Sequence, residues 1–322
     1  MSGRAPTRVS SFLAGLTPLR RGALIYVTAG LVFVVGDSLV KALVADVPVV
    51  HVVLGRNAVY LAAVVLLAGG RRPRRLLATT RPGMQLARGL AMFGTTATWF
   101  FALSLLPFAD VSTLSSTTPF IVVALAGPFL GERVTKPALV GTVVGFVGVV
   151  VMVGMDPAQL DLALLVPLAN AAIFAMFGLL TRSLRADPPE VTLFYSGLVP
   201  MLAAIVLFAI VPTTTAPTPT QWLAIGVVGL VTLTGHRLMV AAYRWGRASD
   251  LAPLGYLSLL WAFVVGAIIF AEPIQLRALV GAAAIALGGA VVLRSAPPGE
   301  EPAQALADYG GPVEAEAEEA RP

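Results

Sequence analysis

Two stretches of this chain carry the same pattern, 140 positions apart. Residues 110–153 and 250–293 each contain an acidic residue, a long apolar run, a second acidic residue, Ala-Leu-Val-Gly and another apolar run. The matching positions are Asp110 and Asp250, Leu114 and Leu254, Glu132 and Glu272, Gly141 and Gly281, and Gly148 and Gly288. Self-similarity at a fixed interval indicates repeated structural units. The fold is therefore expected to contain two copies of one unit.

Composition restricts what those units can be. Hydrophobic residues make up 57% of the chain and charged residues 12%, against about 45 to 50% and about 25% in soluble domains. Apolar runs of about 20 residues, enough to cross roughly 30 Å of hydrocarbon as helices, recur along the sequence. The expected spans are residues 22–45, 48–69, 83–106, 108–131, 137–155, 160–183, 190–211, 219–243, 249–271 and 275–294. We predict an all-α integral membrane protein with ten transmembrane helices.

Basic residues are sorted between the two sides of the predicted membrane. The N-terminal arm and every second loop contain arginine or lysine, and residues 71–75 alone contain four arginines. The loops on the opposite side contain neither. The positive-inside rule therefore predicts that both termini are cytoplasmic. Five spans per copy turn the second copy upside down, which gives two inverted-topology five-helix repeats.

Four segments follow from this topology. Residues 1–21 form a basic cytoplasmic arm, residues 22–155 the first five-helix repeat and residues 156–294 the second. The first apolar run is too long for the core of a signal peptide and has no small-residue cleavage site after it, so it is expected to remain a span. Residues 295–322 are rich in proline, glycine and acidic residues, and we expect a disordered cytoplasmic tail.

Short motifs extend the duplication. They are Pro119, Leu130-Gly131-Glu132, Ala138-Leu139-Val140-Gly141, Gly145 and Gly148 in the first copy, and Ala252-Pro253, Tyr256, Glu272-Pro273, Gly281 and Gly288-Gly289 in the second. Over residues 22–294 this set resembles the drug/metabolite transporter superfamily, EamA type. The resemblance implies a ten-helix bundle of two inverted repeats that moves a small metabolite by alternating access, and it implies no particular substrate.

Two features of the motifs have a physical interpretation of their own. Gly141, Gly145 and Gly148 recur at i, i+4 and i+7, on one face of a helix. Small residues let helices approach closely in lipid, so we expect these glycines to pack helices and not to contact substrate. Glu132 and Glu272 fall at the predicted interfaces, where we expect them to be solvated.

Ionisable side chains at bilayer depth are costly and mark candidate functional sites. Asp37 and Arg56 each lie about eight residues, or about 12 Å, from the outer end of their helices. We therefore expect an ion pair between the first two spans, with Lys41 one helical turn from Asp37 on the same side. Two interpretations stay open: a structural clamp between these helices, or a carboxylate-binding site that Asp37 partly neutralises.

Further basic residues lie in the third and eighth spans. If Arg56, Arg88 and Arg237 face one cavity, its excess positive charge favours an anionic or zwitterionic substrate with a carboxylate. These arginines are our candidate anion ligands, and Asp37, Lys41 and His236 are candidate gating or orienting residues. The uncharged substrate-binding candidates are Asn57, Trp99, Ser116, Thr117, Tyr256 and Trp261. Hydroxyls such as those in residues 112–118 either line a cavity or bond their own helix carbonyls, and we favour the cavity.

The leading hypothesis is a secondary transporter of a small polar metabolite in a bacterial cytoplasmic (inner) membrane. The alternative within the superfamily is an exporter of amino acids or amphipathic drugs. A membrane enzyme is less supported, because no nucleophile–base pair, metal set or carboxylate dyad lies at depth and the chain has no cysteine. A channel is less supported because no selectivity-filter loop is recognisable.

Few partners are expected. The sequence predicts no catalytic residue, metal or cofactor. Nucleic-acid binding is not expected, because the arginines are distributed over loops and do not form one basic face. The expected partners are a small-molecule substrate and the lipid bilayer, and a homodimer is left open.

Overall fold

The computed structural model describes residues 16–44, 46–68, 76–106, 111, 114–153, 162–211, 215–269 and 276–294. The elements within these ranges are helices, and none of these residues forms a strand. Their bounds are α2 Pro18–Leu43, α3 Val49–Leu67, α4 Pro82–Leu105, α6 Thr118–Leu130, α7 Lys136–Val153, η2 Leu162–Leu164, α8 Leu165–Ser183, α9 Pro189–Ile210, α10 Pro219–Trp245, α11 Ala248–Leu251, η3 Ala252–Tyr256, α12 Leu257–Ile269 and α13 Leu276–Arg294.

Six described helical segments are long and apolar enough to cross a membrane. They are α2, α3, η2 with α8, α9, α10 and α13. The prediction of a helical protein with several membrane spans is therefore confirmed, whereas the number ten and the inverted repeat stay predictions.

Local signals explain where helices begin. Proline occupies the first helical position of α2, α4, α9 and α10, where its missing N–H is not needed and its φ angle suits a helix. Helix α10 also has a capping box, in which the Thr218 side chain accepts from the Gln221 N–H and the Gln221 side chain accepts from the Thr218 N–H. These two bonds satisfy donors that the first turn leaves without partners.

Two predicted spans, 108–131 and 249–271, are not continuous helices. In the first, α6 begins only at Thr118, after a turn at residues 116–117. In the second, α11 gives way to the 3-10 helix η3 before α12 begins. A proline lies near each break, Pro119 and Pro253, and proline lacks the N–H that a continuous helix requires. Both corrections fall at corresponding positions of the duplicated sequence.

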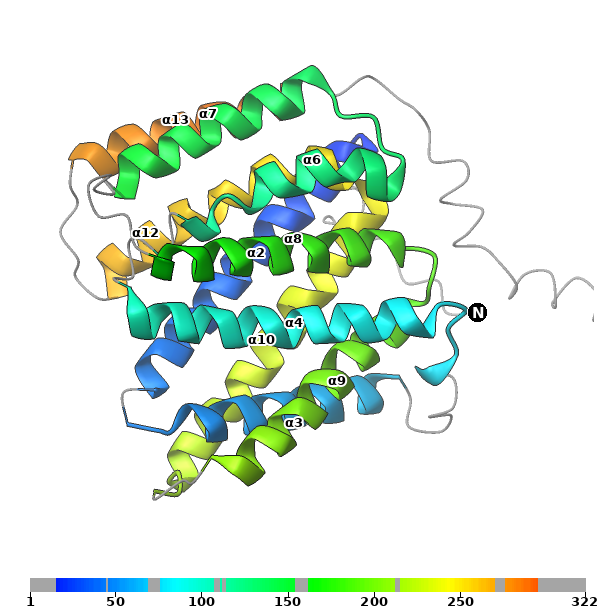
Figure 1. Cartoon of the computed structure of the whole chain (residues 1–322), viewed down its shortest axis with the longest axis vertical. Helices are drawn as coiled ribbons and strands as arrows, with labels where there is room; N and C mark the ends of the chain where they lie inside the picture. The colour runs from blue at the N-terminus through cyan, green and yellow to red at the C-terminus, as the bar shows by residue number, and fades with distance from the viewer. Residues whose placement is uncertain are drawn as a thin grey trace, which may run out of the picture.

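Figure 1 shows how the helices are arranged. Helices α7 and α13 lie together along one edge of the molecule, and α3 and α9 lie at the opposite edge. Between them, α10 packs against α2 and α3, while α4 packs against α8 and α9. Helix α12 packs against α2, and α6 packs against α8. We call α2, α3, α10, α11 and α12 the α2 group, and α4, α6, α8 and α9 the α8 group.

Glycines bring α7 and α13 into backbone contact. A Cβ atom on Gly141 would lie 2.8 Å from the carbonyl oxygen of Gly288, and one on Gly288 would lie 2.8 Å from that of Gly141. Gly148 and Gly281 make the same reciprocal contact: a Cβ atom on Gly148 would lie 2.7 Å from the Gly281 carbonyl oxygen, and one on Gly281 would lie 2.5 Å from that of Gly148. Since the lower number of one helix meets the higher number of the other, the two helices run antiparallel. The predicted packing role of these glycines agrees with their contacts.

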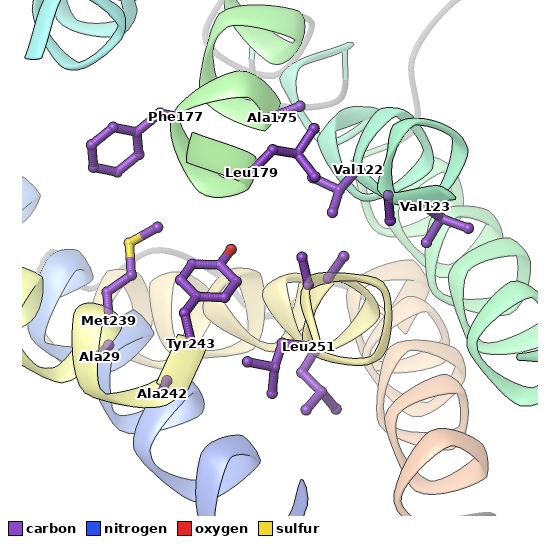
Figure 2. Close-up of a cluster of buried hydrophobic side chains, with 14 of the residues drawn as sticks. Ala29, Val122, Val123, Ala175, Phe177, Leu179, Met239, Ala242, Tyr243 and Leu251 are labelled. Atoms are coloured by element: carbon purple, nitrogen blue, oxygen red, sulfur yellow. The ribbon is translucent and has the colours of Figure 1, made fainter. Parts of the chain in front are cut away.

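A buried apolar cluster lies between the two groups. Figure 2 shows Phe177 and Leu179 of α8 with Val122 of α6, facing Tyr243 of α10 and Leu251 of α11. Each of these side chains is at most 3% exposed. The cluster lies toward the end of the bundle where α8 and α10 terminate. We call this the basic end, because Arg81, Arg182 and Arg244 meet there.

Candidate functional site

Asp37 and Arg56 interact through their charges, but the expected direct ion pair is absent from the described residues. Helix α10 explains the separation, since it packs against both α2 and α3. The approach of α10 to α3 is close at Gly229, where a Cβ atom would lie 2.7 Å from the carbonyl oxygen of Arg56. The two helices that carry the charges are not direct neighbours along their lengths. The interpretation of Asp37 and Arg56 as a structural clamp required a direct ion pair between them, and the described residues do not form it.

The side chain of Asp37 is exposed although it does not lie on the outer face of α2. That outer face carries Val35 and Leu39, which are 40% and 36% exposed. Residues two apart in a helix point in nearly opposite directions, about 200° apart. Asp37 instead shares a side with Gly30, which lies against Ser258 of α12. Asp37 is thus exposed on a side of α2 that is turned away from Val35 and Leu39.

Polar atoms without partners gather on α3 and α10. The Nε of Arg56, the Nδ2 of Asn57, the hydroxyl of Tyr60 and the Nδ1 of His236 are buried, and none makes a hydrogen bond. The His236 ring lies 5.6 Å from that of Tyr60 and 5.2 Å from that of Phe33, measured between ring centroids. Arg56 also interacts with His236 through its charge. Buried donors without partners are rare in native proteins, so this cluster is the strongest candidate for ligand contact.

Tyr60 was not among the residues singled out from the sequence. It is fully buried, and its ring fills the space above Gly197 of α9, where a Cβ would lie 2.8 Å from the ring. A single tyrosine inside a long apolar run carries no periodic signal. Only the fold brings it beside His236.

Arg88 lies deeper between helices than the other basic candidates. It is 1% exposed, and its Nε donates to the Thr181 hydroxyl at 2.7 Å. Its Nη1 donates to the Thr192 carbonyl at 3.3 Å and to the hydroxyl of Ser196. The guanidinium also stacks 4.5 Å from the centroid of Phe177. Arg88 thus links α4 to α8 and α9, and only its Nη2 remains without a partner.

Arg237 is separated from the other candidates. It is exposed, on the face of α10 that also carries Leu223, Val227, Leu230 and Thr234, all of them exposed. These residues follow one another at spacings of three and four, the signature of a single helix face. Arg237 therefore does not meet the condition that it shares a cavity with Arg56, because its exposed face of α10 points out of the bundle.

The hydroxyl-rich segment before α6 is only partly described, since Ser112 and Thr113 lie outside the described residues. Ser116 and Thr117 are partly exposed. The Thr117 hydroxyl donates to the Leu114 carbonyl at 2.7 Å, so it uses its proton within its own turn. A hydroxyl bonded in this way still offers acceptor lone pairs to a ligand.

The aromatic candidates lie in different surroundings. Trp99 is partly exposed near the end of α4. Tyr256 is 2% exposed, with its ring against Gly145, and its hydroxyl has no partner. The Nε1 of Trp261, on α12, is likewise buried without a partner.

Lys41, the candidate gating residue one helical turn from Asp37, is exposed on α2.

A polar network closes the basic end. The Glu132 carboxylate accepts from Arg182 Nε at 3.0 Å, from the backbone N–H of Ala248 at 3.3 Å, and from both the N–H and the hydroxyl of Ser249 at 3.2 Å. Arg182 also donates to the Tyr243 carbonyl at 2.5 Å. The Glu132 side chain is 7% exposed, so the prediction that it is solvated is wrong. Its partners lie far away in the sequence, which is why the local pattern did not indicate them.

More bonds join the α2 group to loops next to the α8 group at the same end. Arg244 donates to the carbonyls of Arg185 and Asp187 at 3.0 and 2.9 Å, and Thr135 donates to Asp250 at 3.3 Å. Between described residues, no side-chain hydrogen bond joins the α2 group to the α8 group at the opposite end. In the described conformation these hydrogen bonds therefore close the basic end of the bundle.

Comparison with known proteins agrees with this architecture. Residues 20–154 and 161–294 each match the model of the EamA-like transporter family. The chain therefore belongs to the EamA-like transporter family and is a membrane protein of the drug/metabolite transporter type, as the sequence motifs predicted.

Individual relatives share between a quarter and a third of their residues with this chain. It is 30% identical to a riboflavin transporter of Brucella anthropi over 216 residues, which cover 66% of this chain and 76% of the relative. It is 27% identical to the pseudopaline exporter CntI of Pseudomonas aeruginosa, over 76% of this chain and 85% of the relative. It is also 27% identical to an S-adenosylmethionine uptake transporter of Rickettsia bellii, over 62% of this chain and 68% of the relative.

A crystal structure of another protein has the same fold. It superposes with a TM-score of 0.70 over 84% of this chain and 95% of the other, at 22% identity.

Proposed function

We propose that this protein is a secondary transporter that carries a small polar metabolite with a carboxylate group across the bacterial cytoplasmic membrane by alternating access. One observation carries the proposal. Inside the bundle, Arg56 has a buried Nε–H without a partner, next to further unsatisfied polar atoms of Asn57, Tyr60 and His236. A carboxylate suits such donors, because charge-assisted hydrogen bonds are stronger than neutral ones.

Asp37 and Lys41 have a second role in this proposal. Asp37 interacts with the Arg56 charge and is exposed on a side of α2 turned away from Val35 and Leu39. Its charge partly neutralises the guanidinium without a direct ion pair, and the substrate carboxylate competes for the same positive charge. Asp37 and Lys41 thus orient or gate the substrate, and His236 orients it from α10.

The remaining candidates line the path. Trp99, Ser116, Thr117, Tyr256 and Trp261 lie on α4, η3, α12 and the segment before α6. Among them, the unsatisfied Trp261 Nε1–H and Tyr256 hydroxyl are donors for acceptor groups of the substrate. Arg88 supports the site by fixing α4 against α8 and α9.

The proposed architecture is two inverted five-helix repeats, residues 22–155 and 156–294, with both termini in the cytoplasm. The reciprocal contacts of Gly141 with Gly288 and of Gly148 with Gly281 support it, because exchanging the two copies converts one contact into the other. The exchange also converts the packing of α10 on α2 and α3 into that of α4 on α8 and α9. Such a twofold relation suits alternate opening at the two ends.

The basic end is then the cytoplasmic end, by the positive-inside rule. In the described conformation the Glu132 network and the apolar cluster of Figure 2 close that end. Substrate exchange with the cytoplasm requires the α2 group to separate from the α8 group there. The relatives include an S-adenosylmethionine uptake transporter and a pseudopaline exporter, so the proposal covers the substrate group and not the direction.

The test uses purified protein and the variant Arg56→Gln. A panel of amino acids, organic acids, riboflavin and S-adenosylmethionine is screened for compounds that raise the melting temperature, and each positive compound is tested for uptake into proteoliposomes. Arg56→Gln should keep the melting temperature of the unliganded protein but lose the ligand-induced shift and the uptake. Arg294→Gln, which removes an exposed charge at the end of α13, is the matched control. An unchanged ligand shift in Arg56→Gln would remove Arg56 from the site.

A further inference from the structure

Arg237 is unusual because it is a charged residue on the outer face of a spanning helix. It lies eight residues before Trp245, the last residue of α10, which is roughly 12 Å along the helix. Among the described residues no hydrogen bond or ion pair satisfies its guanidinium. A lone arginine facing hydrocarbon is costly, so a group outside the chain must satisfy it.

A groove lies directly beside this arginine. It has a volume of about 280 Å³ and is lined by Ala63, Leu66 and Leu67 of α3 and by Leu230, Leu233, Thr234 and Arg237 of α10. Leu66 and Leu67 belong to the last turn of α3 and are 75% and 64% exposed. The groove therefore lies at the basic end of the bundle, with an apolar wall and one positive charge.

The groove has the features that a phospholipid requires. An acyl chain fits the wall of Leu66, Leu67 and Leu230, and the flexible stem of Arg237 lets its guanidinium reach toward the interface. Thr234 donates its hydroxyl proton to the Leu230 carbonyl at 2.9 Å, and no hydrogen bond joins it to Arg237 among the described residues. An anionic headgroup supplies the counter-charge that the described residues do not.

We propose that the groove between α3 and α10 binds an anionic phospholipid, with its phosphate on Arg237 and one acyl chain along the groove. Negative lipids accumulate near basic segments of membrane proteins through the same attraction. Bound there, the lipid bridges α3 and α10 alongside the contact at which Gly55 and Gly229 bring the two helices together. The lipid site is distinct from the substrate site proposed above and does not depend on it.

The test compares lipids of different charge. Purified protein in a neutral detergent is mixed with phosphatidylglycerol or phosphatidylcholine, and the melting temperature and the number of lipids retained in native mass spectrometry are measured. Phosphatidylglycerol should raise the melting temperature of the unaltered protein by several degrees more than phosphatidylcholine. Arg237→Gln should lose at least half of that difference, whereas Arg237→Lys, which keeps the charge, and Arg294→Gln, which removes a charge elsewhere, should retain it.

Three results would overturn the proposal. The first is an equal response to the two lipids in the unaltered protein, and the second is a full phosphatidylglycerol effect in Arg237→Gln. The third is an equal shift with glycerol phosphate alone, which would mean that the acyl chain contributes nothing. The Arg56→Gln variant should keep the lipid response, so failure of the substrate site and failure of the lipid site are distinguishable.

Discussion

The Nε of Arg182 lies 3.0 Å from Oε1 of Glu132, and the two side chains are only 10% and 7% exposed. This pair joins the segment after α6 to α8, and the same carboxylate accepts backbone N–H bonds from Ala248 and Ser249 of α11, in the α2 group. A buried ion pair adds little net stability, yet removal of one partner leaves a costly uncompensated charge. Glu132 is therefore the residue through which the two groups hold the basic end closed.

Replacement of Glu132 by Gln should favour opening of that end. The amide accepts hydrogen bonds but leaves Arg182 without a counter-charge, a loss of about 3 kcal/mol, or about 100-fold in a conformational equilibrium. The chain has no cysteine, so a cysteine introduced at the fully buried position Ala242 reports opening. Its reaction rate with a water-soluble maleimide should rise by about the same factor.

Glu190 offers the matched control for this experiment. It is exposed in the first turn of α9, and Glu190→Gln should leave the labelling rate unchanged. If Glu132→Gln labels no faster than the Glu190→Gln control, the carboxylate does not hold the closed conformation.

The contact of α7 with α13 gives a second prediction. A Cβ on Gly281 would lie 2.5 Å from the Gly148 carbonyl and 2.6 Å from the Met152 Cβ, so Gly281→Ala must push the helices apart. Overpacking of this kind costs about 1 to 3 kcal/mol. The melting temperature should fall accordingly. Gly83→Ala is the control, because nothing lies within 4 Å of its Cβ position, and an equal effect of the two substitutions would contradict the close contact.

The helices and their packing glycines could be predicted from the sequence because both depend on local patterns. Apolar runs of span length predicted α2, α3, α9 and α10 to within a few residues. The spacing of Gly141 and Gly148 predicted a packing face, and their contacts with Gly288 and Gly281 lie on that face. The breaks near Pro119 and Pro253 were missed, since a proline near a helix start is also compatible with an uninterrupted span.

The rotation of each helix could not be predicted in the same way. A span that is apolar on all sides has no amphipathic pattern from which its inner face can be recognised. The sequence predicted that Arg237 could share a cavity with Arg56, yet Arg237 lies on the exposed face of α10 that also carries Leu230 and Thr234. Glu132 became buried because of residues 50 or more positions away, which no local pattern contains.

Ser196 provides a test of the structural role of Arg88. Its hydroxyl donates to the Thr192 carbonyl at 2.6 Å and accepts from Arg88. Ser196→Ala removes that acceptor and leaves a buried guanidinium N–H unsatisfied, at a cost of about 1 to 3 kcal/mol. Ser183, whose hydroxyl bonds only to the Leu179 carbonyl at 3.0 Å, is the matched control. Denaturation of Ser183→Ala should resemble that of the unaltered protein, and a similar result for Ser196→Ala would mean that Arg88 does not need this partner.

Tyr60 allows substrate contact to be separated from stability. Its hydroxyl lies beside Arg88 and Ser196 without a hydrogen bond of good geometry, so Tyr60→Phe keeps the packing of the ring and should cost no more than the about 0.5 to 1.5 kcal/mol of one hydrogen bond. A hydroxyl that bonds the substrate carboxylate contributes about 1.5 to 3 kcal/mol, so the affinity for any compound found by thermal screening should fall about 10-fold or more. Tyr195→Phe, on the partly exposed side of α9, should leave affinity unchanged. If Tyr60→Phe destabilises the protein and leaves affinity intact, the tyrosine is a packing residue, and the substrate site does not extend from Arg56 to the α3–α9 contact.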